Sequence, residues 1–519
     1  MTERSASHSG TEPRVAPDRV SKDPTPRSTT SKYADLREGT ARGAVSGVIG
    51  GLAFGGAMFD LGLLESVALI VRTDSILVGL VIHMVIASII GAGLGALVAY
   101  HRPDPGETMI WGLAYGAFWW FLGAATLLPV LSGNMPSWLA SDAAELVPAL
   151  VGHLVYGSVT GLVLALGWMR QGIERAWGLD VLRGASAGLI GAVLLGWALD
   201  DGSGPLAVSP AMADLSSTTA WLITLVVGTF AGITFALLFD GRERGGGPML
   251  IRGAAFGLLW WLLIGLTLLP LLRGDGLQWQ LTDLRSAFNT LPGYVLLLGA
   301  LPAVISHLAG RVGHALFNDN LAARPGDSLG TQGLQVLTRG ALAGIVGGLV
   351  FTVVMLQIGF LPTVSGLVGF GSTFVGAVLH LAISTVLGIG YGVLFIRRSN
   401  DPGSALGWGV SYGALWWMGG PLTLLPIVLG DGPMWTIEAA REAYPALVGH
   451  LAYGAFLGLT FYRLEARHSP WWIPRNQMDS ERAERTVAQL RSSAPALWLV
   501  VVLITVALPV LLGTGVATA

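Results

Sequence analysis

The chain of 519 residues is 52% hydrophobic and only 12% charged, with a formal net charge of -2 at pH 7 and a mean hydropathy of +0.63. This composition excludes a water-soluble domain of this size, because there are too few charged side chains to cover its surface. The near-neutral charge gives no electrostatic reason to expect nucleic acid as a partner, and the absence of cysteine excludes disulfides, thiolate metal sites and cysteine nucleophiles. The partner that the composition predicts is a lipid bilayer.

The first 40 residues are polar, rich in Ser, Thr and Pro, and lack the apolar core of a signal peptide, so we expect a disordered cytoplasmic tail. Apolar runs of about 18 to 24 residues follow, which is the length that crosses about 30 Å of hydrocarbon. They predict thirteen spans, at 43-60, 76-99, 109-130, 146-168, 184-199, 218-239, 250-271, 291-310, 340-360, 373-396, 405-428, 444-462 and 496-512. The expected fold is an all-α polytopic membrane protein.

Arginines mark every second set of span ends. By the positive-inside rule these ends, and with them the N-terminus, are cytoplasmic, whereas the short C-terminal tail lies outside. The exceptions are Arg72, Arg273, Arg285 and Arg441. Because nearly all basic residues are arginine, we expect a bacterial protein of the cytoplasmic (inner) membrane.

Internal repetition divides the spans into three units of four helices. An Arg-Gly-Ala string opens each unit, at Arg42, Arg183 and Arg339. Two spans later, a Trp-Trp pair is followed by Thr-Leu-Leu-Pro, which ends at Pro129, Pro270 and Pro426. The chain therefore divides into repeat 1 (residues 41-175), repeat 2 (181-316), repeat 3 (337-465), a cytoplasmic connector (466-494) and a C-terminal transmembrane helix with its tail (495-519).

Each repeat contains two helical hairpins, because every odd-numbered span of the first twelve begins with GxxxG. Small residues four apart allow two helix backbones to approach each other in a bilayer, so we expect these glycines to serve helix packing. The six pairs are Gly43/Gly47, Gly112/Gly116, Gly184/Gly188, Gly253/Gly257, Gly340/Gly344 and Gly409/Gly413. The architecture is thus six tandem hairpins plus one C-terminal span, with all hairpins in the same orientation.

Four histidines recur within the spans, where an ionisable group is costly and therefore a functional candidate. His83 and His153 lie in the second and fourth spans of repeat 1, and His380 and His450 lie in the matching spans of repeat 3. Each lies about 10 Å below the outer boundary, at about 1.5 Å per helical residue. Tyr156 and Tyr453 follow His153 and His450 by three residues, which puts a phenol close to the same helix face.

These histidines allow several interpretations. They could bind a polar ligand or ion, hold a haem or another metal, or relay protons; alternatively, each could form a hydrogen bond that only locks helix packing. No complete ligand set is visible, so the cofactor stays unknown, with none as the default. No catalytic constellation is recognisable either, so we expect no enzyme activity.

Repeat 2 looks degenerate at these positions. The glycine-anchored register puts Thr224 where the first histidine should lie. In the fourth span, matching Pro292 to Pro148 puts Leu297 in place of the second histidine and leaves His307 at an unrelated position.

The string from 380 to 391, the Gly407-Trp408-Gly409 motif with Trp416, and the stretch from Trp435 to His450 resemble the YagU-like family of bacterial inner-membrane proteins. The resemblance covers one four-helix unit at a time. It implies that His380 and His450, with their counterparts His83 and His153, match the family's histidines. It implies location more than chemistry, because the family has no established activity.

The sequence thus predicts a multi-pass membrane protein that binds or transports a small molecule or ion at outer-leaflet histidine sites between repeats. One alternative is a haem- or metal-binding protein that uses histidine pairs, and another is a structural or scaffolding protein of the membrane.

Overall fold

The computed structural model describes residues 29–100, 104–168, 177–199, 208–209, 212, 214–239, 246–315, 329–396, 398, 401–466 and 493–513. Within these ranges the chain forms helices and no strand, which confirms the predicted all-α fold. Most of the predicted tail and connector lies outside the described residues. Helix α1 begins at Thr29, however, well before the predicted start of the first span.

Repeat 1 consists of α1 (Thr29–Asp60), α2 (Leu64–Ala68), η1 (Leu69–Val71), α3 (Ile76–Val98), α4 (Pro105–Trp119), η2 (Trp120–Leu127), α5 (Leu128–Leu131), α6 (Ala140–Glu145) and α7 (Val147–Trp168). Repeat 2 consists of α8 (Trp177–Ala198), α9 (Ser217–Leu238), α10 (Gly246–Trp260), η4 (Trp261–Leu268), α11 (Leu269–Arg273), α12 (Leu281–Ser286), η5 (Phe288–Thr290), α13 (Leu291–Gly293), η6 (Tyr294–Ala300) and α14 (Leu301–Ala315).

Repeat 3 consists of α15 (Leu329–Gln357), α16 (Leu361–Gly366), α17 (Thr373–Phe395), α18 (Pro402–Gly419), η7 (Gly420–Leu424), α19 (Leu425–Leu429), α20 (Ile437–Glu442) and α21 (Tyr444–Ala466). The last helix is α23 (Ala494–Leu512). The segments η2, η4, η6 and η7 are π-helical turns.

Among the described residues, 12 helices are long and apolar enough to cross a membrane, one fewer than the sequence predicted. The helix that falls short is α21, which has 23 residues but includes polar side chains such as His450, Arg463 and Glu465. It packs against α15 and α18, as α7 packs against α1 and α4 in repeat 1. Its place in the bundle is therefore that of the fourth span of repeat 3.

Contacts between glycine backbones join the two helices of each hairpin. A Cβ atom on Gly43 or Gly47 of α1 would overlap backbone atoms of α3 near Gly91 and Gly95. In the second hairpin, Gly112 of α4 lies against Gly157 of α7 in the same way. Equivalent contacts occur at Gly184, Gly188, Gly253, Gly257, Gly340, Gly344, Gly409 and Gly413. The part of α1 that precedes the predicted span makes a similar close contact, because Gly39 packs against the end of α3.

The repeats are joined by a contact that occurs twice. Gly106, in the first turn of α4, packs against Phe239 at the end of α9, so repeat 1 meets repeat 2 there. Gly247 of α10 packs against Phe395 of α17 in the same manner and joins repeat 2 to repeat 3. The third equivalent glycine is Gly403 of α18, and among the described residues only the Asp401 side chain lies near the position of its Cβ atom.

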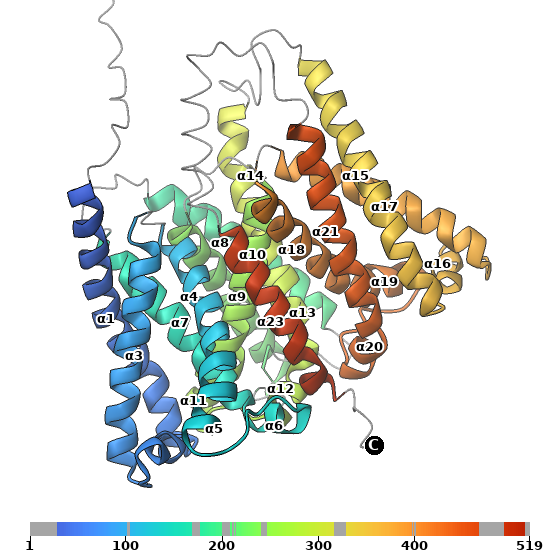
Figure 1. Cartoon of the computed structure of the whole chain (residues 1–519). Helices are drawn as coiled ribbons and strands as arrows, with labels where there is room; N and C mark the ends of the chain where they lie inside the picture. Colours follow the sequence, from blue (N-terminus) through green and yellow to red (C-terminus); the bar gives the residue numbers. More distant parts are fainter. Residues whose placement is uncertain are drawn as a thin grey trace, which may run out of the picture.

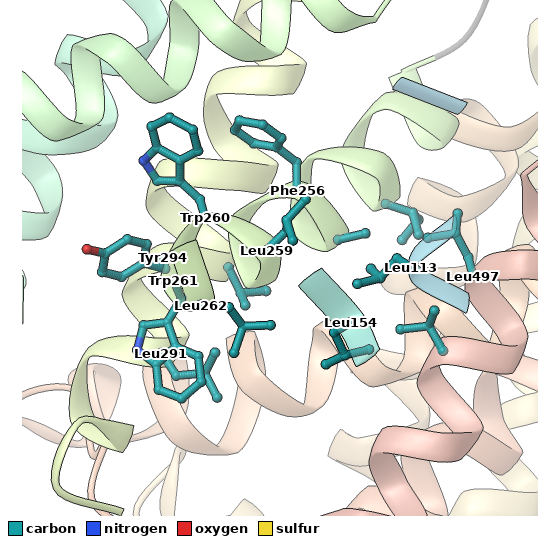
Figure 2. Packing of buried hydrophobic residues seen from close by; sticks show 14 of the residues in the cluster. Leu113, Leu154, Phe256, Leu259, Trp260, Trp261, Leu262, Leu291, Tyr294 and Leu497 are labelled. Atoms are coloured by element: carbon teal, nitrogen blue, oxygen red, sulfur yellow. The ribbon is translucent and has the colours of Figure 1, made fainter. Parts of the chain in front are cut away.

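Helix α23 lies where the three repeats converge, in red at the centre of Figure 1. It packs mainly against α4 and α18 and more lightly against α10, which are the third spans of the three repeats. It also contacts the short helices α6, α12 and α20 at the lower end in Figure 1. The main hydrophobic core continues across these elements, and in Figure 2 Leu113 and Leu154 of repeat 1, Trp261 of repeat 2 and Leu497 of α23 belong to one cluster.

Arginine side chains hold the C-terminal end of α23. Arg285 donates hydrogen bonds to the carbonyl oxygens of Val510 and Leu511, and Arg441 donates to that of Leu512. The last carbonyls of a helix lack their usual partners four residues ahead, and positive charge there is favoured by the helix dipole. Two of the four arginines that depart from the positive-inside pattern are thereby explained.

A third exception, Arg273, pairs with Asp214 at 2.9 Å in the connection that precedes α9. This hydrogen bond from the guanidinium holds the pKa of the Asp214 carboxyl below its usual value. The arginine therefore stabilises a loop contact.

At the opposite end of α23, Arg252 of α10 forms a buried ion pair with Glu107 of α4. Its Nε also donates to the Ser493 hydroxyl at 3.2 Å, and its guanidinium lies 6.0 Å from the centroid of the Trp408 ring. All three repeats and α23 thus meet around one charged group.

Candidate functional site

The four predicted histidines come together as two pairs, each around a phenylalanine of the repeat's first helix. The Phe54 ring lies 5.5 Å from His83 and 5.1 Å from His153, edge-on to both. In repeat 3, Phe351 lies 4.8 Å from His380 and 4.5 Å from His450 with similar angles. Each pair therefore lies within one repeat, whereas the sequence-based hypothesis located the site between repeats.

Hydrogen bonds to oxygen fix one nitrogen of each imidazole in repeat 1. His83 Nε2 donates to the carbonyl oxygen of Gly51 at 3.0 Å, and His153 Nδ1 donates to that of Ala149 at 2.7 Å. A carbonyl can only accept, so the bonded nitrogen carries the proton and the other nitrogen of a neutral ring carries a lone pair.

In repeat 3 one nitrogen of each imidazole also donates to oxygen, but one of the two acceptors is a hydroxyl. His450 Nδ1 donates to the Ala446 carbonyl at 2.8 Å, as His153 does to Ala149. His380 Nδ1 donates to the Thr352 hydroxyl at 2.9 Å, because that hydroxyl itself donates to the Gly348 carbonyl. Gly348 and Gly51 occupy the same position in their repeats, so the hydroxyl extends an otherwise equivalent contact.

The predicted tyrosines do not face an open site. Tyr156 donates to the Ala87 carbonyl at 2.6 Å, and Tyr453 donates to the Ser384 carbonyl at 2.8 Å. Each bond ties the fourth span of its repeat to the second, one helical turn from a histidine. The tyrosines therefore hold the helices that carry the histidines.

Repeat 2 lacks both histidines at the equivalent positions. Gly188 packs against Gly232 as Gly47 packs against Gly91, which puts Thr224 at the position of His83, as predicted. In the fourth span, Gly257 packs against Tyr294 where Gly116 packs against His153.

The residue at the second histidine position is thus Tyr294 and not Leu297. Matching the prolines gave the wrong register, because Pro292 lies two residues before Tyr294 whereas Pro148 lies five residues before His153. The π-helical turn η6 adds a further residue between Tyr294 and the glycine contact that follows. Leu195 of α8 takes the place of the phenylalanine, because it packs against Gly293 as Phe54 packs against Gly152. His307 lies in α14, away from this position.

The repeated Thr-Leu-Leu-Pro motif joins the end of the π-helical turn of each third span to the short α-helix that follows. The threonine donates to the carbonyl five residues before it, and a tryptophan of the next loop donates to the threonine oxygen. The three tryptophan–threonine pairs are Trp138–Thr126 at 3.1 Å, Trp279–Thr267 at 2.9 Å and Trp435–Thr423 at 2.9 Å. The motif therefore anchors a loop to a locally widened helix.

The chemistry offered by each histidine pair is limited. Within the described ranges, no group of three or more His, Asp or Glu side chains lies close enough to hold a metal ion. Phe54 and Phe351 fill the space beside both imidazoles of their pairs, so a porphyrin would have to displace them.

Sequence reasoning found the four histidines but missed Phe54 and Phe351. A signal was present, because each follows by four residues an equivalent glycine, Gly50 or Gly347. It also missed the Glu107–Arg252 pair, whose members are in different repeats.

The fold defines an all-α polytopic membrane protein with many apolar helices, for which a lipid bilayer is the natural environment. No family model matches the chain, and neither a curated protein nor a solved structure does. The resemblance of its repeats to the YagU-like family stays a prediction.

Proposed function

We propose that this membrane protein binds a small molecule or ion at two equivalent sites, one at the His83/His153 pair and one at the His380/His450 pair. The observation that carries the proposal is the matched pattern of proton donation in the two pairs. In all four imidazoles one ring nitrogen donates a hydrogen bond to an oxygen atom. The other ring nitrogen makes no hydrogen bond to any described residue. Two preorganised acceptors per repeat are what a ligand site requires.

The partial exposure of His153 and His450 supports access to these sites. Tyr294, which replaces them in repeat 2, is 0% exposed, whereas both histidines retain some exposed surface. A histidine that only locked helix packing would gain nothing from this difference. Passage of the ligand across the membrane is a natural extension, because pseudo-symmetric bundles commonly carry transport sites between their helices.

For the location, we propose a bacterial cytoplasmic membrane with the N-terminus in the cytoplasm and the C-terminus outside. The support is the distribution of arginines, which is strengthened by the roles of Arg285 and Arg441 at the end of α23. In this orientation the histidine pairs lie in the outer leaflet.

A thermal-shift screen of ions and small molecules against the purified protein tests the binding function. We expect at least one compound to raise the melting temperature of the wild type but not that of a His153→Phe/His450→Phe variant. Tyr294→Phe is the matched control, because it removes a polar group at the same position of repeat 2. If every active compound raised the melting temperature of the wild type and of the histidine variant equally, the histidines would have a structural role only.

A further inference from the structure

The proline of each Thr-Leu-Leu-Pro motif leaves one backbone carbonyl without a donor from its own helix. In repeat 1, the N–H of Leu128 donates to the Gly123 carbonyl, five residues back. The next residue is Pro129, which has no N–H, so the carbonyl of Ala124 receives no hydrogen bond from four or five residues ahead. The matching carbonyls are those of Gly265 in repeat 2 and Pro421 in repeat 3, since Leu269 donates to Ile264 and Leu425 donates to Gly420.

The backbone carbonyl of the next residue in the chain accepts a hydrogen bond of the same kind in every repeat. Loop N–H groups donate to it, with the pairs Ser137–Ala125 at 2.8 Å, Gln278–Leu266 at 3.0 Å and Met434–Leu422 at 2.9 Å. The three repeats therefore share one local geometry, and the remaining carbonyl can be compared directly between them.

In repeat 2 the chain itself satisfies this carbonyl. The hydroxyl of Ser209, from the connection between α8 and α9, donates to the Gly265 carbonyl at 2.7 Å. The preceding carbonyl, of Val208, accepts from the Tyr294 hydroxyl at 3.0 Å. Val208, Ser209 and Tyr294 are each 0% exposed, so a hydroxyl-bearing segment fills the space between the π-helical turn and the position of the second histidine.

In repeats 1 and 3 the corresponding segment lies elsewhere. The connections after α1 and α15 form α2 and α16, which pack against α3 and α17. Among the described residues, no group from outside the helix donates to the carbonyl of Ala124 or Pro421. In repeat 3 the histidine remains close to the turn, because His450 Nε2 lies 3.8 Å from the Cβ position of Gly420. In repeat 1, Ala124 belongs to the same hydrophobic cluster as Ala149, whose carbonyl accepts from His153.

We propose that this place in repeats 1 and 3 binds a small neutral molecule bearing hydroxyl groups, for which Ser209 is the built-in substitute in repeat 2. One hydroxyl of the ligand donates to the carbonyl of Ala124 or Pro421, and a second donates to Nε2 of His153 or His450. Both protein groups are acceptors, so the ligand must be a donor. A neutral donor is favoured over an ammonium ion, because a charge in the membrane interior is costly when no carboxylate pairs with it. This inference rests on the proposed binding function and names its ligand class.

Binding of radiolabelled glycerol and erythritol to the full-length protein in lipid nanodiscs tests the inference. The informative variant is Pro129→Ala/Pro426→Ala, because each alanine restores an N–H that can donate to the open carbonyl while preserving helical structure. We expect saturable binding of at least one polyol to the wild type, and an affinity at least tenfold lower for the variant. Pro270→Ala is the matched control, since Ser209 already occupies that carbonyl, and its binding should equal that of the wild type.

Radiolabelled methylammonium forms the third arm and separates a neutral ligand from a charged one. Tighter binding of methylammonium than of either polyol would overturn the ligand class, as would polyol binding that is the same in wild type and Pro129→Ala/Pro426→Ala. If that variant does not fold, loss of polyol binding in His153→Phe/His450→Phe with retention in Tyr294→Phe decides the question. Absence of polyol binding alongside a histidine-dependent thermal shift by another compound would refute this inference and leave the proposed function intact.

Discussion

The Glu107–Arg252 pair is the clearest case of a single side chain on which the assembly depends. Both side chains are at most 3% exposed, and they belong to different repeats. Removing one partner of a buried pair leaves an uncompensated charge and typically costs about 3–5 kcal/mol, whereas replacing both by apolar groups is often neutral.

We therefore expect Arg252→Met to lower the stability of the protein by about 3–5 kcal/mol. The double variant Arg252→Met/Glu107→Leu should recover most of this loss. Melting temperatures in detergent, compared among the three proteins, measure the effect. An equal loss in the single and double variants would mean that the pair contributes packing and not charge compensation.

At this scale the sequence predicts residues that recur and misses those that depart from the repeat. The histidines could be found because they occur twice in the same register. Arg252 could not, because it stands one residue before Gly253 where Trp111 and Trp408 stand before the corresponding glycines. Nothing in a single sequence pairs it with Glu107, which lies in another repeat.

At the scale of helices, the glycine contacts define a sharp prediction. A Cβ atom on Gly344 of α15 would overlap the Ser384 carbonyl of α17, so Gly344→Ala must separate the two helices. Overpacking of this kind typically costs about 1–3 kcal/mol. Gly56→Ala, in the equivalent helix of repeat 1, is the control, because no described residue lies within 4 Å of its Cβ position. Thermal unfolding should separate the two variants; equal melting temperatures would exclude a tight contact at Gly344.

The sequence predicted most spans, because apolar length is a strong constraint in a bilayer. Local departures from α-helical geometry were not predictable. The turn η6 inserts a residue into the fourth span of repeat 2. Pro292 is also not the counterpart of Pro148, so alignment by proline gave Leu297 where the helix packing gives Tyr294. The α8–α9 connection likewise could not be placed, because its contact with Gly265 depends on the folded bundle.

For the whole molecule, the orientation in the membrane can be tested directly, because the chain contains no cysteine. Single cysteines at Met135 and Tyr33 are suitable, since these side chains are 84% and 73% exposed and belong to opposite ends of the bundle. In intact cells we expect Met135→Cys to react with an impermeant thiol reagent and Tyr33→Cys to react only after permeabilisation. The reverse pattern would invert the proposed topology.

The contact between repeats, Gly106 on Phe239 and Gly247 on Phe395, has a consequence for how such a chain can grow. It joins two different surfaces, so a series of identical units linked in this way either closes into a ring or extends without limit. The described residues contain three such units. Val98 stands where the later repeats carry phenylalanine, and α23 packs against Gly407 of α18, one turn beyond the unmatched Gly403. Within the described residues, both ends of the series therefore lack the glycine–phenylalanine pair that joins one unit to the next.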